Sequence, residues 1–92
     1  MINNRTNKPT KLNIVPNPSS SGLVKITMAD FEGKATIYIY DVLGQKVAEQ
    51  PINVISGASV AMDISTLVPG VYLMTAENSS VKASARLIKI GK

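Results

Sequence analysis

The sequence predicts an all-β domain, an immunoglobulin-like β-sandwich of about seven antiparallel strands with Greek-key connections. From residue 12 onward apolar residues alternate with polar ones at a period of two, the pattern of strands that bury one face. Turn-forming residues interrupt this pattern at spacings of about 8 to 12 residues, and no stretch shows the period of a helix. The 92 residues suffice for one hydrophobic core and leave no room for a second domain.

The first two strands are expected over residues 12–15 and 22–29. The first is a short apolar run that ends at Pro16, Asn17 and Pro18, because prolines fix φ and lack the N–H that a sheet ladder needs. In the second strand the apolar residues of one face are Val24, Ile26 and Met28.

Two hairpins are expected in the middle of the chain. Residues 35–40 and 45–50 flank Asp41-Val42-Leu43-Gly44, in which Gly44 is the natural position for a positive φ. Residues 52–55 and 58–64 flank Ser56-Gly57, which is also a hairpin signal.

The last two strands are expected over residues 71–76 and 81–90, with a polar turn between them. In the final strand the apolar positions change face near Leu87, since Ile88 and Ile90 lie opposite the earlier ones. This pattern predicts either a bulge near Leu87 or a strand end that is covered on both faces, and a partner could supply that cover.

A short motif precedes the strand at residues 71–76. Leu67, Pro69 and Gly70 stand just ahead of Tyr72, as in the tyrosine corner of Greek-key sandwiches, where the hydroxyl bonds to upstream backbone. A ligand-binding role for Tyr72 is the alternative.

The composition argues against an enzyme and against any cofactor. The chain contains no Cys and no His, which removes thiolate chemistry, disulfides and the commonest general base and metal ligand. The six carboxylates form no recognisable acid/base pair, and the three Tyr and one Phe lie outside the basic clusters that nucleic-acid binding would require. No run of about 20 apolar residues, the length of a membrane span, is present. We therefore expect a domain that is recognised and performs no reaction.

Positive charge is concentrated at the two ends of the chain. Residues 1–11, 12–80 and 81–92 carry net charges of +3, −3 and +4. Residues 1–11 offer little to bury and are expected to form a flexible linker ahead of the domain at residues 12–92. The linker residues considered for processing are Asn3, Arg5, Lys8 and Lys11. The segment lacks the apolar region of a secretory signal peptide.

Three motifs occur in order along the chain: Pro16-Asn17-Pro18 followed by Ser and Gly, the segment YIYDVLGQKV at residues 38–47, and DISTLVPGVY at residues 63–72. The basic and apolar segment RLIKI at residues 86–90 follows them. Together, over residues 12–90, they resemble the type A C-terminal sorting domain of proteins exported by the type IX secretion system of Bacteroidetes.

The resemblance implies that the domain forms the C-terminal end of a larger exported protein and addresses this cargo to an outer-membrane translocon and a shuttle protein. It implies transit through the periplasm, delivery to the cell surface or release, and removal by a surface sortase that cuts in or before the linker.

The last strand and its tail are the expected recognition site, because they are basic and free of acids: Arg86, Leu87, Ile88, Lys89, Ile90 and Lys92. We expect edge pairing of this strand with the secretion machinery, while Arg86 and Lys89 contact acidic groups.

A second hypothesis is an immunoglobulin-like spacer or a module that binds glycans or proteins at the cell surface. Glycan binding would use exposed aromatic rings, and Tyr38 and Tyr40 are the two that one strand face can bring together.

Overall fold

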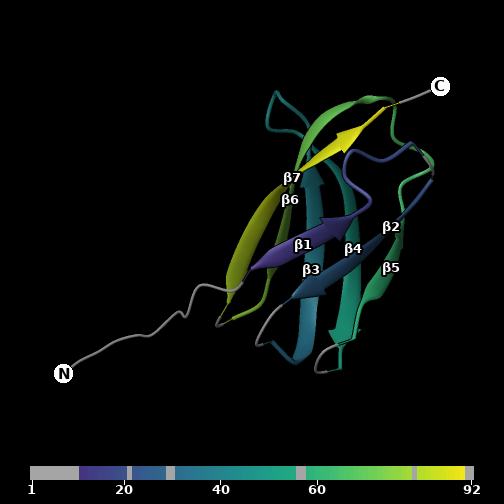
Figure 1. Cartoon of the computed structure of the whole chain (residues 1–92). Coiled ribbons are helices and arrows are strands. Elements are labelled where there is room, and N and C mark those ends of the chain that lie inside the picture. The colour runs from purple at the N-terminus through teal and green to yellow at the C-terminus, as the bar shows by residue number, and fades with distance from the viewer. Residues whose placement is uncertain (1–10, 21, 29–30, 56–57, 80, 91–92) are drawn as a thin grey trace.

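A computed structural model describes residues 11–20, 22–28, 31–55, 58–79 and 81–90, and these residues form two packed antiparallel sheets (Figure 1). One sheet has the strand order β1-β2-β5 and the other β4-β3-β6-β7. The strands are β1 Leu12–Val15, β2 Leu23–Met28, β3 Gly33–Tyr40, β4 Lys46–Val54, β5 Val60–Asp63, β6 Gly70–Glu77 and β7 Lys82–Lys89. The predicted all-β, immunoglobulin-like sandwich is confirmed. Within the described residues no helix is long and apolar enough to cross a membrane.

The core lies between the inward faces of the two sheets. Alternate residues of β2 and β3 are buried, and Ile26, Ile37 and Ile39 have almost no exposed surface. Met74 of β6 and Leu87 of β7 lie in the same sheet as β3, face β2 across the core and are fully buried. The period of two in the sequence therefore identified the buried face of these strands correctly.

The predicted second hairpin is wrong. The two segments expected over residues 45–50 and 52–55 merge into one strand, β4, which pairs with β3, whereas β5 pairs with β2 in the other sheet. The chain therefore crosses between the sheets after β4, and Ser56 and Gly57 at this crossing lie outside the described residues. Pro51 is accommodated because β4 is an edge strand, where a missing N–H breaks no ladder.

The turn between β3 and β4 is organised by Asp41. Its Oδ1 accepts hydrogen bonds from the backbone N–H groups of Leu43 (2.9 Å) and Gln45 (3.0 Å), which is the usual role of Asp at the start of a turn. Gly44 has a φ of 83°, a backbone conformation that is energetically costly for any residue with an L side chain. The turn therefore holds Val42 and Leu43 out in solvent, where they are 78% and 79% exposed.

The crossing from β5 to β6 ends in a tyrosine corner. The hydroxyl of Tyr72 donates a 2.5 Å hydrogen bond to the carbonyl of Val68, and the side chain of Leu67 is buried beneath the turn. Tyr72 is itself buried, so its ring belongs to the core and its hydroxyl fixes the connection between the sheets.

We expect Tyr72→Phe to lower the free energy of unfolding by about 1 kcal/mol, because one partly buried hydrogen bond is lost with little change in volume. Urea denaturation followed by circular dichroism measures the effect. Tyr38→Phe is the matched control, since within the described residues its hydroxyl makes no hydrogen bond. Equal stability of the two variants would contradict a structural role for the corner.

Candidate recognition surface

The end of β7 is fastened to the loop between β1 and β2. Asn17 donates from Nδ2 to the carbonyl of Arg86 (2.8 Å) and accepts at Oδ1 from the N–H of Ile88 (3.0 Å). Ser19 continues the pattern with its backbone, donating to the carbonyl of Ile88 (2.8 Å) and accepting from the N–H of Ile90 (2.9 Å). The Asn17 carboxamide therefore takes the place of a strand residue, since it offers one donor and one acceptor in line with the ladder. We call these four hydrogen bonds the loop clamp.

The loop clamp changes the expected mode of recognition. Edge pairing at the end of β7 would require the outward backbone groups of Arg86, Ile88 and Ile90, and these groups are already bonded to Asn17 and Ser19. A partner strand could pair there only by displacing the loop. The side chains on the face of the sheet are therefore the accessible part of this segment.

The change of face near Leu87 is not a bulge, since the register between β6 and β7 is continuous over the whole of β7. Leu87 is fully buried in the core, whereas Ile88 lies on the outer face, where it is half-buried opposite Val71. Ile90 follows the strand and is 49% exposed. The strand end is thus apolar on both faces, and its outer face remains accessible.

The side chain of Lys89 is hydrogen-bonded within the domain itself. Its Nζ donates to the carbonyls of Ile64 (2.9 Å) and Leu67 (2.7 Å), so the ammonium group caps the turn that leads to the tyrosine corner. The pKa of nearby Asp63 is lowered by hydrogen bonds from the side chain and backbone of Ser65 and, to a smaller extent, by the positive charge of Lys89. Contact between Lys89 and an acidic partner would require these bonds to break.

Arg86 points away from the core on the outer face of the four-stranded sheet. It lies in one cross-strand row with Leu73 of β6 and Tyr40 of β3, and Val71 and Ile88 form the neighbouring row. Val71 and Leu73 are each 46% exposed, and Arg86 is exposed as well. The sequence did not single out Val71 and Leu73, although their alternation with buried Tyr72 and Met74 places them on the solvent face.

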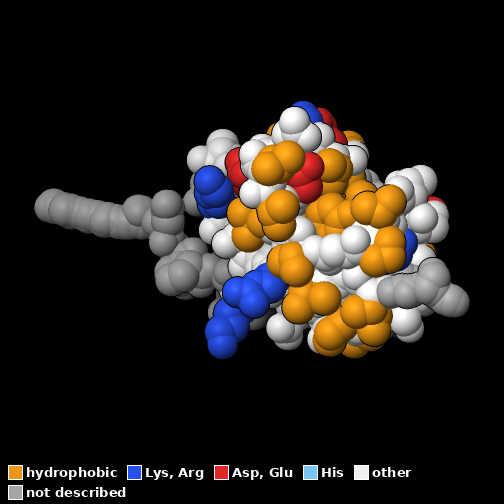
Figure 2. Space-filling view, turned by 90° about the horizontal axis from the view of Figure 1, so that it is seen from above, with side chains coloured by type: hydrophobic (Ala, Val, Ile, Leu, Met, Phe, Trp, Pro, Cys, Tyr) orange, Lys and Arg blue, Asp and Glu red, His pale blue; other side chains and the backbone are white. Residues whose placement is uncertain are grey.

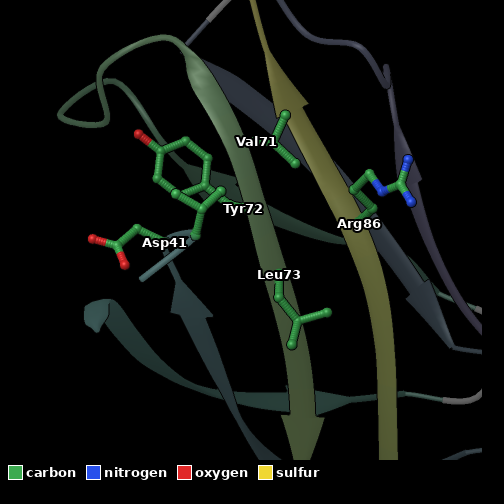
Figure 3. A pocket seen from close by; sticks show the side chains of 6 residues that line it. Asp41, Val71, Tyr72, Leu73 and Arg86 are labelled. Carbon is green, nitrogen blue, oxygen red and sulfur yellow. The ribbon is translucent and has the colours of Figure 1, made fainter. Parts of the chain in front are cut away.

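A pocket of about 180 Å³ opens beside this row (Figure 3). Its lining residues come from the β3–β4 turn, β6 and β7: Asp41, Val42, Val71, Tyr72, Leu73 and Arg86. Figure 2 views the molecule from above and shows hydrophobic side chains gathered over this end of the sandwich, with Lys and Arg side chains at the margin and Asp and Glu side chains beside them. This end combines an apolar surface with charges of both signs.

Tyr38 and Tyr40 do not form an open aromatic platform. Both are half-buried on the outer sheet face, with ring centroids 6.3 Å apart and planes tilted by 31°. The Nζ of Lys46 lies 5.4 Å from the Tyr38 ring centroid and pairs with Glu49 at 2.7 Å, which raises the pKa of Lys46. Since Lys46 occupies one side of the Tyr38 ring, this arrangement gives little support to glycan binding.

The remaining predicted residues do not line the pocket or lie outside the described part of the chain. Lys11 is exposed directly before β1, whereas Asn3, Arg5, Lys8 and Lys92 lie outside the described residues. Figure 1 shows that β1 runs toward the end of the sandwich where β7 finishes, so Lys11 precedes β1 at the strand end farther from it.

We expect Asn17→Ala to lower the free energy of unfolding by about 1 to 3 kcal/mol, because two hydrogen bonds to β7 are lost together. The amide of Ile88 should also exchange with deuterium faster. Asn13→Ala is the control, since its exposed side chain makes no hydrogen bond within the described residues. Unchanged exchange at Ile88 would show that the loop clamp does not hold the strand.

Comparison with known proteins agrees with the sequence motifs. No curated protein matches the chain closely enough to be counted as a relative. A family described as the secretion system C-terminal sorting domain matches residues 13–90, which include all seven strands except the first residue of β1. The chain therefore belongs to the family of C-terminal sorting domains of the type IX secretion system.

Proposed function

We propose that this domain is the sorting signal of a cargo protein attached to its N-terminal side. The type IX outer-membrane translocon and its shuttle protein recognise the signal in the folded state. Membership of the sorting-domain family implies export to the cell surface or release. The observation that carries the folded-state mechanism is the loop clamp, which holds β7 in the sheet and leaves its outer side chains accessible. The domain acts by being bound and performs no reaction.

The positions of the strand ends support this arrangement. In Figure 1, β1 runs toward the end of the sandwich where β7 finishes, so the described chain enters β1 at the strand end farther from it. A cargo joined ahead of Leu12 would therefore lie away from Arg86 and the pocket. The recognition surface could then be reached while the cargo is still attached.

Arg86 is the central charge of the proposed recognition surface. Lys89 already donates to two carbonyls of the domain, whereas Arg86 has no acidic partner among the described residues, whose one ion pair joins Lys46 and Glu49. An exposed guanidinium beside apolar side chains can steer an acidic partner and hydrogen-bond to it.

We expect Arg86→Glu to reduce export of a fused periplasmic reporter about tenfold in a host with a type IX system, because charge reversal replaces attraction by repulsion. Reporter in the medium and on the cell surface is compared with reporter retained in the periplasm. Lys82→Glu is the control, since Lys82 is exposed on the same face of β7 but does not line the pocket.

Urea denaturation of both purified variants shows whether the domain remains folded, and the Arg86 backbone carbonyl can still accept from Asn17. Normal export of a folded Arg86→Glu variant would exclude Arg86 from recognition.

We also propose that a surface sortase removes the domain by cutting within residues 1–11. Lys11 is exposed just before β1, and a protease needs an extended segment of chain outside folded strands. Cleavage there would leave the sandwich intact and free the cargo.

We expect deletion of residues 3–10 to leave export intact but to keep the domain joined to the cargo, because the remaining segment is too close to β1 for the sortase. Immunoblotting of surface material with antibodies against cargo and domain gives the readout. A Gly-Ser replacement of equal length separates the effect of length from that of sequence. Normal cleavage of the deletion variant would place the cut elsewhere.

A further inference from the structure

The pocket beside Arg86 has the size and lining of a site for one or two apolar side chains. Its volume is about 180 Å³, and three aliphatic side chains line it: Val42, Val71 and Leu73. An enclosed, wholly apolar cavity of about 150 Å³ can accept a molecule as large as benzene, so the volume of this pocket suffices for an aliphatic side chain. The pocket is open at the surface, so a side chain of another protein can enter without rearrangement of the core.

Exposure of these aliphatic residues is unfavourable in the isolated domain. Val42 is 78% exposed, and Val71 and Leu73 are 46% exposed, although each could be polar without loss to the core. Ile88 lies opposite Val71 in the neighbouring strand, and exposed Leu43 follows Val42 in the turn, so further apolar residues adjoin these three. Apolar surfaces of this kind mark contacts with other proteins or with membranes.

The charges at the rim distinguish between possible occupants. Asp41 and Arg86 lie on opposite sides of the pocket, with Val71 and Leu73 between them (Figure 3). The Asp41 carboxylate already accepts from the backbone of the β3–β4 turn, whereas the Arg86 guanidinium has no acidic partner within the described residues. An occupant must therefore place an apolar group in the pocket and an anionic group on the side of Arg86 only.

We propose that the pocket binds a segment of the secretion machinery in which an aliphatic side chain stands next to Asp or Glu. The aliphatic side chain fills the space between Val42, Val71 and Leu73, and the neighbouring carboxylate accepts hydrogen bonds from Arg86. The segment needs no strand pairing with β7, whose outer edge is occupied at this level by the loop clamp. This inference rests on the proposed function and specifies the chemistry of the partner.

A peptide titration tests the proposal on the full 92-residue chain. The probes are the blocked tetrapeptides acetyl-Ser-Leu-Asp-Ser-amide, acetyl-Ser-Leu-Asn-Ser-amide and acetyl-Ser-Ser-Asp-Ser-amide, added at millimolar concentration to the isotope-labelled protein and followed by amide chemical shifts. We expect the first peptide to shift the amides of Val42, Val71, Leu73 and Arg86. The second and third should bind about tenfold more weakly, because each lacks one of the two contacts.

Two variants connect the titration to the named side chains. Arg86→Glu should abolish the preference for the Asp peptide over the Asn peptide, and Leu73→Ser should weaken binding of both. Lys82→Glu should leave all three titrations unchanged, because Lys82 does not line the pocket.

Several results would overturn the proposal. These are no shifts with any peptide, equal binding of the Asp and Asn peptides, or shifts that map elsewhere. Co-sedimentation of the protein with phosphatidylglycerol vesicles, lost in Arg86→Glu, would instead assign the surface to anionic lipid. If Arg86→Glu blocks export while the Asp peptide fails to bind, the sorting function stands and only the inferred partner chemistry fails.

Discussion

The hydrogen bonds of Asn17 and Ser19 to β7 are the constraint on which the rest of the recognition surface depends. They join residues that are about 70 positions apart in the chain, and they attach the loop of one sheet to the edge strand of the other. Without them the end of β7 would lose the hydrogen bonds of its outer edge, and the backbone of Arg86 and Ile88 would be less firmly fixed. The loop that looks like a simple chain reversal therefore determines how the last strand is displayed.

Because of this attachment, neighbouring residues of β7 have different roles. Leu87 fills the core and Lys89 caps a turn, so both stabilise the domain, whereas Arg86 and Ile88 project from the outer face. Alternation along a strand thus separates residues that build the fold from residues that a partner can reach. A segment that is basic and apolar throughout its sequence thus serves two purposes in the structure.

Much of the fold could be predicted from the sequence, because the buried faces of β2 and β3 follow from alternation and the β3–β4 turn from Asp41 and Gly44. The pairing of β5 with β2 could not be predicted, since alternation shows which face of a strand is buried but not which strand lies beside it. The role of Lys89 was also missed, because a sequence gives the charge of a side chain without the nearest acceptor. Val71 and Leu73 join the candidate surface only once β3, β6 and β7 are placed side by side.

Pro51 in β4 affects whether copies of this domain can pair with one another through the edges of their sheets. A four-stranded sheet has two exposed edges, and open edges allow identical molecules to polymerise. In this sheet one edge strand contains a residue without an N–H, and the other is bonded along its terminal half to Asn17 and Ser19. Copies of this domain at high local concentration are therefore hindered from joining into aggregates through the edges of the four-stranded sheet.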